Sequence, residues 1–276
     1  MKSSIKILIA YILLFFVSSC TKYDSPPNLF YGKLKTIKIN NDAALYLEYD
    51  STNGNLIRVK NDSLHLEIKF GSLINNEIVI RNNTTSQQII VRISATKNIE
   101  SVILLDTLTA IQKLYFSAHY SNNNIDTTTE YGDVFVSNIQ NYTFISDSFN
   151  YLKNNLSWQV SDFSGGTISY EDTVIYTFNP QIYDAYLPLQ KPIQSIGYAL
   201  SGNVFEDPSA LNLLELNGIN IFKKNKNLIQ SVKSANYGYI TNLSYVLNTL
   251  NQVIEMNVSN PDGTGTYLTY RMTYYE

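Results

Sequence analysis

Residues 45–60 read LYLEYDSTNGNLIRVK, and this stretch decides the fold class of the chain. Leu45 and Leu47 fall on one face of an extended segment, because successive side chains of a strand point to opposite faces. The Asn53-Gly54 pair supplies the positive φ that a tight hairpin turn needs, and a second β-forming run follows it. The stretch therefore predicts a β-hairpin.

The same alternation recurs along the chain. Residues 64–70 (LHLEIKF) alternate apolar with polar side chains, and so do residues 267–275 (YLTYRMTYY), which follow an Asp262-Gly263 turn. The 22 tyrosines favour strands, while the frequent Asn residues and the 12 glycines favour turns. The sequence predicts an all-β fold, an antiparallel meander of hairpins forming a sandwich or an incomplete barrel. Short strands with charged outer faces argue against a true transmembrane barrel.

One β domain is expected over residues 30–276. The polar stretch 121–129 (SNNNIDTTT) reads as a loop and is one place where the domain could split in two. The proline-containing region 180–208 is the other. At most one short helix is expected, near 207–217, with Gly218 as its stop.

Two segments of the chain resemble each other. Residues 45–62 (LYLEYDSTNGNLIRVKND) and residues 243–260 (LSYVLNTLNQVIEMNVSN) both run strand, Asn-containing turn, strand. They form a weak internal repeat of one hairpin pattern.

The first twenty residues, MKSSIKILIAYILLFFVSSC, predict export. Lys2 and Lys6 form a short basic region, and two small serines precede Cys20. The apolar run over residues 5–17 is shorter than the roughly 20 residues that a membrane-spanning helix needs. This pattern is typical of a secretory signal.

The sequence VSSC at 17–20 resembles a bacterial lipobox. The resemblance implies that residues 1–19 are removed as a lipoprotein signal peptide, that Cys20 carries the lipid, and that residues 20–29 form an acylated tether. Cys20 is the only cysteine, so a disulfide within the chain does not explain it. Thr21 stands where lipoproteins of the inner membrane commonly have Asp, which implies the outer membrane.

The lipobox and the tyrosine-rich hairpins together resemble outer-membrane lipoproteins of the Bacteroidota, including uncharacterised families with a porin-like meander. The resemblance implies a lipid-anchored, non-catalytic binding or structural protein. Several such lipoproteins accompany glycan-import systems, so a glycan-binding accessory is the narrower hypothesis. The expected partners are the membrane, through the acyl anchor on Cys20, and a glycan or an outer-membrane protein.

Composition and histidine content exclude other classes. The formal charge is −3, and removal of Lys2 and Lys6 with the leader brings the mature chain to −5 (−3 − 2). No basic patch suggests nucleic acid. The two histidines, His65 and His119, lack a third metal ligand nearby in the sequence, so neither a metal nor a cofactor is expected. His119 reads as a partly buried core residue.

Glycan binding by a β protein uses aromatic rings that stack on a sugar and amides or acids that bind its hydroxyls. Trp158, the single tryptophan, is the first platform candidate, and Tyr183 and Tyr186 follow. The alternative is that these rings belong to the core. Two other functions stay open: a glycan hydrolase, which needs two acids about 5–10 Å apart, and a scaffold or adhesion module with a protein partner.

Two threonines are candidates for O-glycosylation. Asp106-Thr107-Leu108 and Asp126-Thr127-Thr128 match an Asp-Ser/Thr-aliphatic-or-Thr acceptor pattern. Exported proteins of the Bacteroidota carry glycans at similar sites. The resemblance implies that Thr107 and Thr127 lie on the surface.

Overall fold

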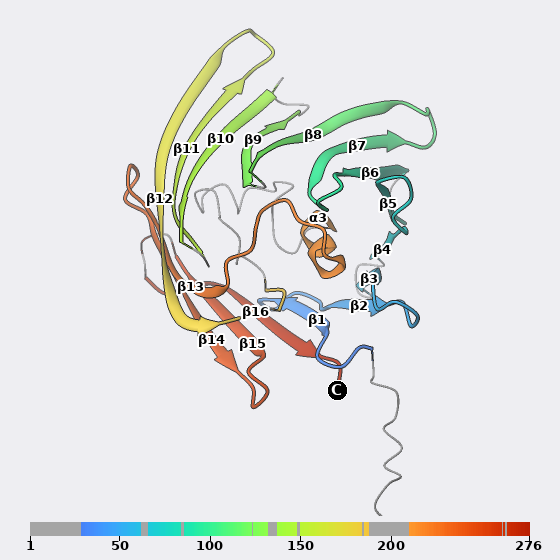
Figure 1. The fold of residues 1–276 in the computed structure, drawn as a ribbon, viewed down its shortest axis with the longest axis vertical. Helices are drawn as coiled ribbons and strands as arrows, with labels where there is room; N and C mark the ends of the chain where they lie inside the picture. The colour runs from blue at the N-terminus through green and yellow to red at the C-terminus, as the bar shows by residue number, and fades with distance from the viewer. Residues whose placement is uncertain are drawn as a thin grey trace, which may run out of the picture.

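A closed antiparallel barrel makes up the protein (Figure 1), and each strand pairs with the next one in the sequence. The computed structural model describes residues 29–61, 66–83, 86–122, 124–131, 137–147, 150–183, 185–187, 210–260, 262 and 264–276. The strands are β1 (Leu34–Ile39), β2 (Leu45–Tyr49), β3 (Leu56–Asn61), β4 (Leu66–Phe70), β5 (Glu77–Asn82), β6 (Gln87–Ile93), β7 (Ile99–Asp106), β8 (Gln112–Ser121), β9 (Asn124–Glu130), β10 (Ser137–Ser146), β11 (Tyr151–Ser161), β12 (Thr167–Ile182), β13 (Asn227–Ser234), β14 (Ile240–Leu247), β15 (Val253–Ser259) and β16 (Thr266–Tyr274).

The first and last strands close the sheet. Ile37 of β1 lies opposite Met272 of β16, and Ile39 lies opposite Tyr270. The all-β antiparallel meander is confirmed, whereas the expected sandwich or incomplete barrel is wrong. Alternation of apolar and polar residues is the same in an open and a closed sheet. Closure depends on a register between the two ends of the sequence, which alternation does not reveal.

The polar stretch 121–129 is mostly strand rather than the expected loop. Strand β9 pairs with β8 on one side and with β10 on the other. Its threonines are β-branched and suit a strand. Ile125, Thr128 and Glu130 are buried. One continuous sheet therefore runs through this stretch, while the division into domains stays a prediction.

A short helical segment follows the expected pattern. Helix α3 (Ala210–Leu213) continues as the 3₁₀ turn η1 (Leu214–Asn217) and ends at Gly218, whose φ is 73°. The expected start, before Ala210, lies outside the described residues. The segment lies inside the ring of strands (Figure 1), where Leu213 and Leu214 are buried. Within the described ranges, no helix has the length and apolar character needed to span a bilayer.

The core lies inside the barrel. The inward faces of β1–β8 carry apolar side chains that are almost fully buried: Ile37, Leu47, Val59, Ile78, Val91, Val102 and Phe116. A porin interior is polar and filled with water. Among the described residues, the interior next to β1–β8 is instead a packed apolar core.

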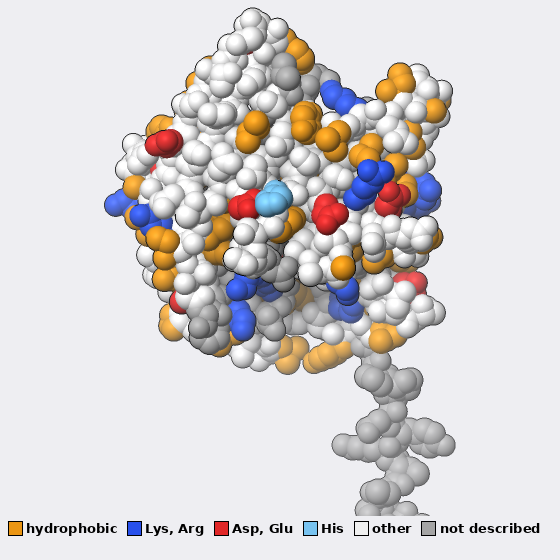
Figure 2. Space-filling view, turned by 45° about the horizontal axis from the view of Figure 1, so that its top comes forward, with side chains coloured by type: hydrophobic (Ala, Val, Ile, Leu, Met, Phe, Trp, Pro, Cys, Tyr) orange, Lys and Arg blue, Asp and Glu red, His pale blue; other side chains and the backbone are white. Residues whose placement is uncertain are grey.

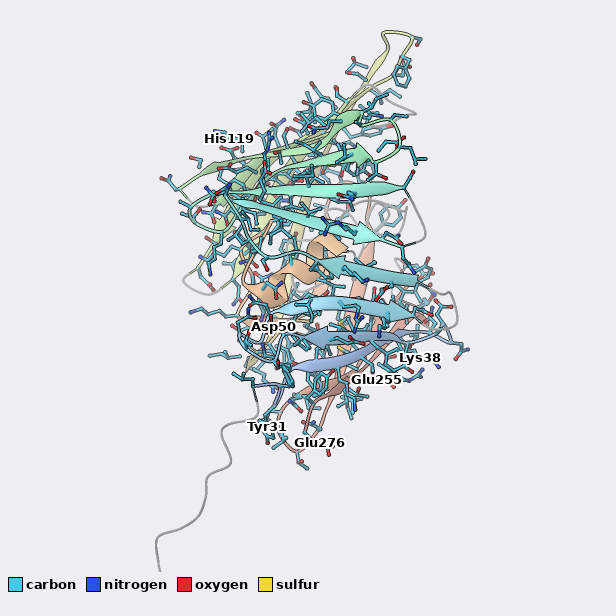
Figure 3. All side chains as sticks on the ribbon, turned by 90° about the vertical axis from the view of Figure 1, so that its right-hand side faces the viewer. Tyr31, Lys38, Asp50, His119, Glu255 and Glu276 are labelled. Atoms are coloured by element: carbon cyan, nitrogen blue, oxygen red, sulfur yellow. The ribbon has the colours of Figure 1, made fainter. Side chains whose placement is uncertain are left out.

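The barrel has two rims, because alternate connections of an up-and-down meander lie at the same end. We call one end the N-terminal rim, which carries residues 29–33 and the turns at 50–55, 71–76 and 248–252. We call the other end the distal rim, which carries the turns at 107–111, 162–166 and 235–239. Figure 3 shows Tyr31 and Asp50 toward the N-terminal rim and Lys38 toward the distal rim.

The repeated hairpin pattern is confirmed at the N-terminal rim. Residues 45–62 contain the pair β2–β3, and residues 243–260 contain the pair β14–β15. In the first turn Asp50 Oδ1 accepts a hydrogen bond from Thr52 N (2.7 Å), and in the second Asn248 Oδ1 accepts one from Leu250 N (2.9 Å). The repeat is therefore one turn chemistry used twice.

Candidate ligand-binding site

A group of aromatic rings lies at the distal rim. The ring of Trp158 stacks on that of Tyr170, with centroids 5.1 Å apart and an interplanar angle of 19°. Tyr237 lies 6.4 Å from Trp158, and Tyr239 stacks on Tyr237 at 6.4 Å. The exposed fraction rises along this series, from 6% for Trp158 through 37% and 44% to 50% for Tyr239. We call these four residues the distal aromatic cluster.

Strand register and one hairpin assemble this cluster. Trp158 of β11 lies directly opposite Tyr170 of β12, so their side chains share one face. The turn that joins β13 to β14 brings the other two rings. Its Asn236 donates from Nδ2 to the carbonyl oxygen of Glu171 (2.9 Å), and its Tyr237 N donates to Ser234 Oγ (3.1 Å). These bonds hold Tyr237 beside Trp158.

A polar wall continues from the cluster into the barrel. Asp172 is 3% exposed, and its Oδ1 accepts hydrogen bonds from Thr173 N (2.7 Å) and Asn236 N (3.2 Å). Among the described residues, Asp172 Oδ2 and the buried Asn154 Oδ1 accept no hydrogen bond. Asn154 lies opposite Val174, so it is a diagonal neighbour of Asp172 on the same inward face.

Buried unsatisfied oxygens carry information about function. Each costs about 1–3 kcal/mol, so two on neighbouring strands suggest that another group completes their hydrogen bonds. Tyr176 lies on the same face of β12 as Asp172. Its burial raises the pKa of its hydroxyl, and Tyr142 and Asp172 add smaller contributions in the same direction. The hydroxyl of Tyr176 therefore stays protonated. Aromatic rings next to amide and carboxylate groups can contact a ligand that has both an apolar face and hydroxyl groups.

Tyr183 and Tyr186 lie away from this cluster. Both are almost fully buried where the chain leaves β12 at the N-terminal rim. Tyr183 OH lies 3.1 Å from Tyr274 OH and accepts a hydrogen bond from Val253 N at 3.2 Å. The structure therefore does not bring them together with Trp158, and their role as ligand platforms stays a prediction.

The glycosylation candidates occupy different settings. Thr107 is exposed in the turn after β7 and donates from Oγ1 to the carbonyl oxygen of Ser86 (2.6 Å). Thr127 is partly buried on β9, and its Oγ1 donates to Asn141 Oδ1 (3.2 Å). Their modification stays a prediction. The lipidation candidate Cys20 lies outside the described residues.

His119 lies on the outer surface, which corrects its expected place in the core. Its Nδ1 is 2.7 Å from Asp126 Oδ1, and its side chain is 75% exposed. Figure 3 shows it on the N-terminal rim side of the barrel wall. His65 lies outside the described residues, among which no group of three or more His, Cys, Asp or Glu could hold a metal ion.

A cavity of about 330 Å³ opens at the N-terminal rim, between the β2–β3 and β4–β5 turns and η1. Two of its polar side chains, Asn217 and Asp50, already bind other parts of the fold. Asn217 accepts from Leu56 N (2.6 Å) and donates to Leu56 O (3.1 Å). Hydrogen bonds from the Thr52 hydroxyl and N–H hold the pKa of Asp50 below its usual range. We therefore rank this cavity below the distal cluster as a binding site.

The outer face of β2–β4 carries a network of opposite charges. Arg58 contacts Glu48 and lies 3.1 Å from Glu67, while Lys60 lies 2.8 Å from Glu48 and Lys69 lies 3.4 Å from Glu67. An Arg or Lys on the lipid face of a membrane barrel costs about 2–4 kcal/mol at the bilayer midplane. This outer face is therefore suited to water.

Uncharged polar groups cover much of the remaining surface. Thr36 Oγ1 lies 2.8 Å from Thr273 Oγ1, and Thr177 Oγ1 lies 2.7 Å from Ser231 Oγ, both across strand pairs. Most of the surface in Figure 2 is white, the colour of uncharged polar side chains and backbone. Exposed apolar side chains such as Ile145, Ile168 and Ile254 are interspersed with these polar groups on the strands.

Comparison with known proteins supports the architecture. No protein-family model and no curated protein matches the chain. A porin-like protein from Bacteroides uniformis is similar in structure, with a TM-score of 0.55 and 12% sequence identity over 89% of this chain and 99% of that chain. At this identity the similarity shows the fold alone.

Proposed function

We propose that this chain is a lipid-anchored, non-catalytic glycan-binding protein of the outer membrane, whose barrel stands outside the bilayer. Cys20 carries the anchor, and the charged outer face of β2–β4 favours a barrel surrounded by water. The fold shared with a porin-like protein of Bacteroides is compatible with an outer-membrane setting.

The observation that carries the binding role is the distal aromatic cluster beside Asp172 and Asn154. A sugar ring presents an apolar C–H face, which Tyr237 and Tyr239 can stack upon. Its hydroxyls can donate to Asp172 Oδ2 and Asn154 Oδ1, which are two of the buried oxygens that accept no hydrogen bond from the described residues. A role as an accessory of an import system would follow from the identity of the glycan.

A thermal-shift screen of the full chain against bacterial and plant polysaccharides tests the proposal. A glycan at 100 times its dissociation constant adds about 2.7 kcal/mol to the stability of the native state. We expect Tyr239→Ala to abolish the rise in Tm. The matched control is Tyr46→Ala, on the outer face of β2, because Tyr46 is 45% exposed and Tyr239 is 50% exposed.

Two results would contradict the binding role. One is the absence of a shift with any glycan in the panel. The other is a shift that Tyr46→Ala and Tyr239→Ala reduce equally.

A further inference from the structure

We propose that the N-terminal rim docks on the lipid bilayer through a band of exposed apolar side chains. The band consists of Leu29, Tyr31, Leu73, Ile74 and Leu250, whose exposed fractions run from 48% to 66%. We call these five residues the rim band. The proposal rests on the proposed lipid anchor at Cys20 and adds to it the face of the barrel that meets the membrane.

The rim band lies along one arc of the N-terminal rim, on both sides of the polar β2–β3 turn at 50–55. Leu250 lies in the β14–β15 turn, Leu29 and Tyr31 precede β1, and Leu73 and Ile74 lie in the β4–β5 turn. These connections belong to strands that follow one another around the closed sheet, in the order β14, β15, β16, β1, β2, β3, β4 and β5. Figure 2 shows hydrophobic side chains along the lower edge of the molecule.

Tight backbone structure holds the rim band in place. Ile74 begins a two-residue turn in which Asn75 and Asn76 have φ angles of 51° and 63°. Ile74 N donates to Glu77 O (3.0 Å), and Glu77 N donates to Ile74 O (2.9 Å). A turn of this kind fixes the direction of its flanking residues. Ile74 therefore stays exposed at the tip and does not fold back onto the barrel.

The start of the described chain is fixed to the same rim. Gly32 N donates to Tyr275 O (2.9 Å), and Tyr275 N donates to Lys33 O (2.9 Å). The ring of Phe30 packs against that of Tyr275, with centroids 5.7 Å apart. The polypeptide therefore leaves the barrel at a defined point within the arc of exposed apolar side chains.

The short tether between Cys20 and the barrel favours the bilayer as the partner of the rim band, because it keeps this rim close to the lipid. Leu29 lies nine positions after Cys20 (29 − 20), and a fully extended chain covers about 3.3–3.6 Å per position. With acyl chains in the bilayer at Cys20, Leu29 stays within about 30 Å of the lipid surface. A rim that is held this close presents its aliphatic side chains to the headgroup region, where such groups gain by burial.

Site-directed fluorescence in vesicles tests the proposal. Acylation consumes the thiol of Cys20, so an introduced cysteine becomes the one reactive thiol of the chain. The full-length lipoprotein is prepared as Ile74→Cys, as Leu250→Cys and as the matched control Ile111→Cys. Ile111 lies in the β7–β8 turn at the distal rim and is 65% exposed, against 66% for Ile74.

Each variant is labelled with an environment-sensitive dye and reconstituted into phosphatidylethanolamine–phosphatidylglycerol vesicles that contain nitroxide-labelled lipid. We expect quenching at positions 74 and 250 to be at least about twofold stronger than at position 111. Equal quenching at the two rims, or stronger quenching at position 111, would overturn the docking.

The same experiment separates the docking from the anchor. If the wild-type chain reacts with the dye, Cys20 is free, and both the lipid anchor and the docking fail. If the wild-type chain is unreactive and floats with the vesicles while position 74 is not quenched, only the docking fails.

Discussion

The two rims of the barrel both expose large apolar side chains, but only the distal rim adds a group of tyrosines to them. The N-terminal rim exposes Leu73, Ile74 and Leu250 together with Tyr31, whereas the distal rim exposes Leu108, Ile111 and Phe163 and, beside them, Tyr170, Tyr237 and Tyr239. An aliphatic side chain gains mainly by leaving water. A tyrosine combines an apolar ring with a hydroxyl and suits a wet, specific contact.

The interior shows the same division. Helix α3 and η1 pack into the N-terminal rim, with Leu213 and Leu214 buried, and Asn217 joins this segment to Leu56 of β3. At the distal rim the wall carries Asp172, a buried carboxylate whose Oδ2 has no partner among the described residues. The N-terminal rim is thus the end filled by the helical segment, and the distal rim is the end with unpaired buried polar groups, where we propose that the ligand binds.

The largest effect is expected from removal of packing at the N-terminal rim. Leu214→Ala deletes a fully buried side chain and should lower the free energy of unfolding by about 2–5 kcal/mol. Urea denaturation measures this change. Leu250→Ala, at an exposed position on the same rim, should stay within about 0.5 kcal/mol of the wild type. A loss below about 1 kcal/mol for Leu214→Ala would mean that the helical segment does not support the barrel.

Substitution of one asparagine at each rim allows a direct comparison of the two rims. Asn217→Ala leaves the N–H and carbonyl of Leu56 without their side-chain partner and should cost about 1–3 kcal/mol. Asn236→Ala removes a more exposed bond to the Glu171 carbonyl and should cost about 1 kcal/mol or less, yet it should weaken the glycan response because Tyr237 loses its support. Denaturation and thermal shift measure the two effects. If Asn217→Ala and Asn236→Ala lost equal stability and Asn236→Ala kept the full glycan response, the proposed difference between the two rims would be wrong.

Substitution of the buried Asp172 tests whether its carboxyl group binds the glycan at the distal rim. Asp172→Asn keeps an oxygen for the bonds from Thr173 N and Asn236 N and replaces the unpartnered Oδ2 with an amide group. Stability at pH 7 should change by less than about 1 kcal/mol, while the thermal shift with glycan should fall. Both are read from melting curves with and without ligand. A stability loss above about 2 kcal/mol would mean that the carboxylate already has its partners.

The smallest effect concerns acid stability, which should be alike at the two rims. Hydrogen bonds from the side chain and N–H of Thr52 lower the pKa of Asp50, and those from the Ser164 side chain and then the Gly166 N–H lower that of Asp162. A carboxyl whose pKa is lower in the folded chain stabilises it fully above the unfolded value of about 3.9. That contribution is lost as pH falls through the folded pKa.

Asp50→Asn and Asp162→Asn should therefore each reduce the drop in Tm between pH 7 and pH 3 by a similar small amount. The asparagine keeps the turn acceptor, so Tm at pH 7 should change little. An unchanged pH dependence in the double variant would show that these turns do not link protonation to folding.

Much of the fold followed from local chemistry. Residues 45–60 form the hairpin that their alternation and Asn-Gly turn predict, and Gly218 ends the helical segment. The polarity of the stretch 121–129 predicts a loop, but most of it forms strand β9, because its β-branched threonines favour a strand. Local patterns therefore predicted the type of secondary structure better than the positions at which the strands begin and end.

The candidate site could be predicted only in part. Trp158 was selected as the single tryptophan, but its ring is the buried base of the cluster rather than an open platform. Tyr170 was missed, because its position opposite Trp158 depends on the register between β11 and β12. Tyr237 and Tyr239 could have been found, since they flank Gly238 in a turn where an exposed aromatic pair is unusual for a purely structural role.

The hairpins, the antiparallel all-β class and the turn chemistry can be read from the sequence, because each depends on residues within one or two strands. The closure of β1 on β16, the filling of the barrel and the meeting of the four distal aromatic rings are visible only in the folded chain. Period-two alternation fixes which side chains share a face. Which strand ends meet, and what then covers each face, depends on pairings between residues far apart in the sequence.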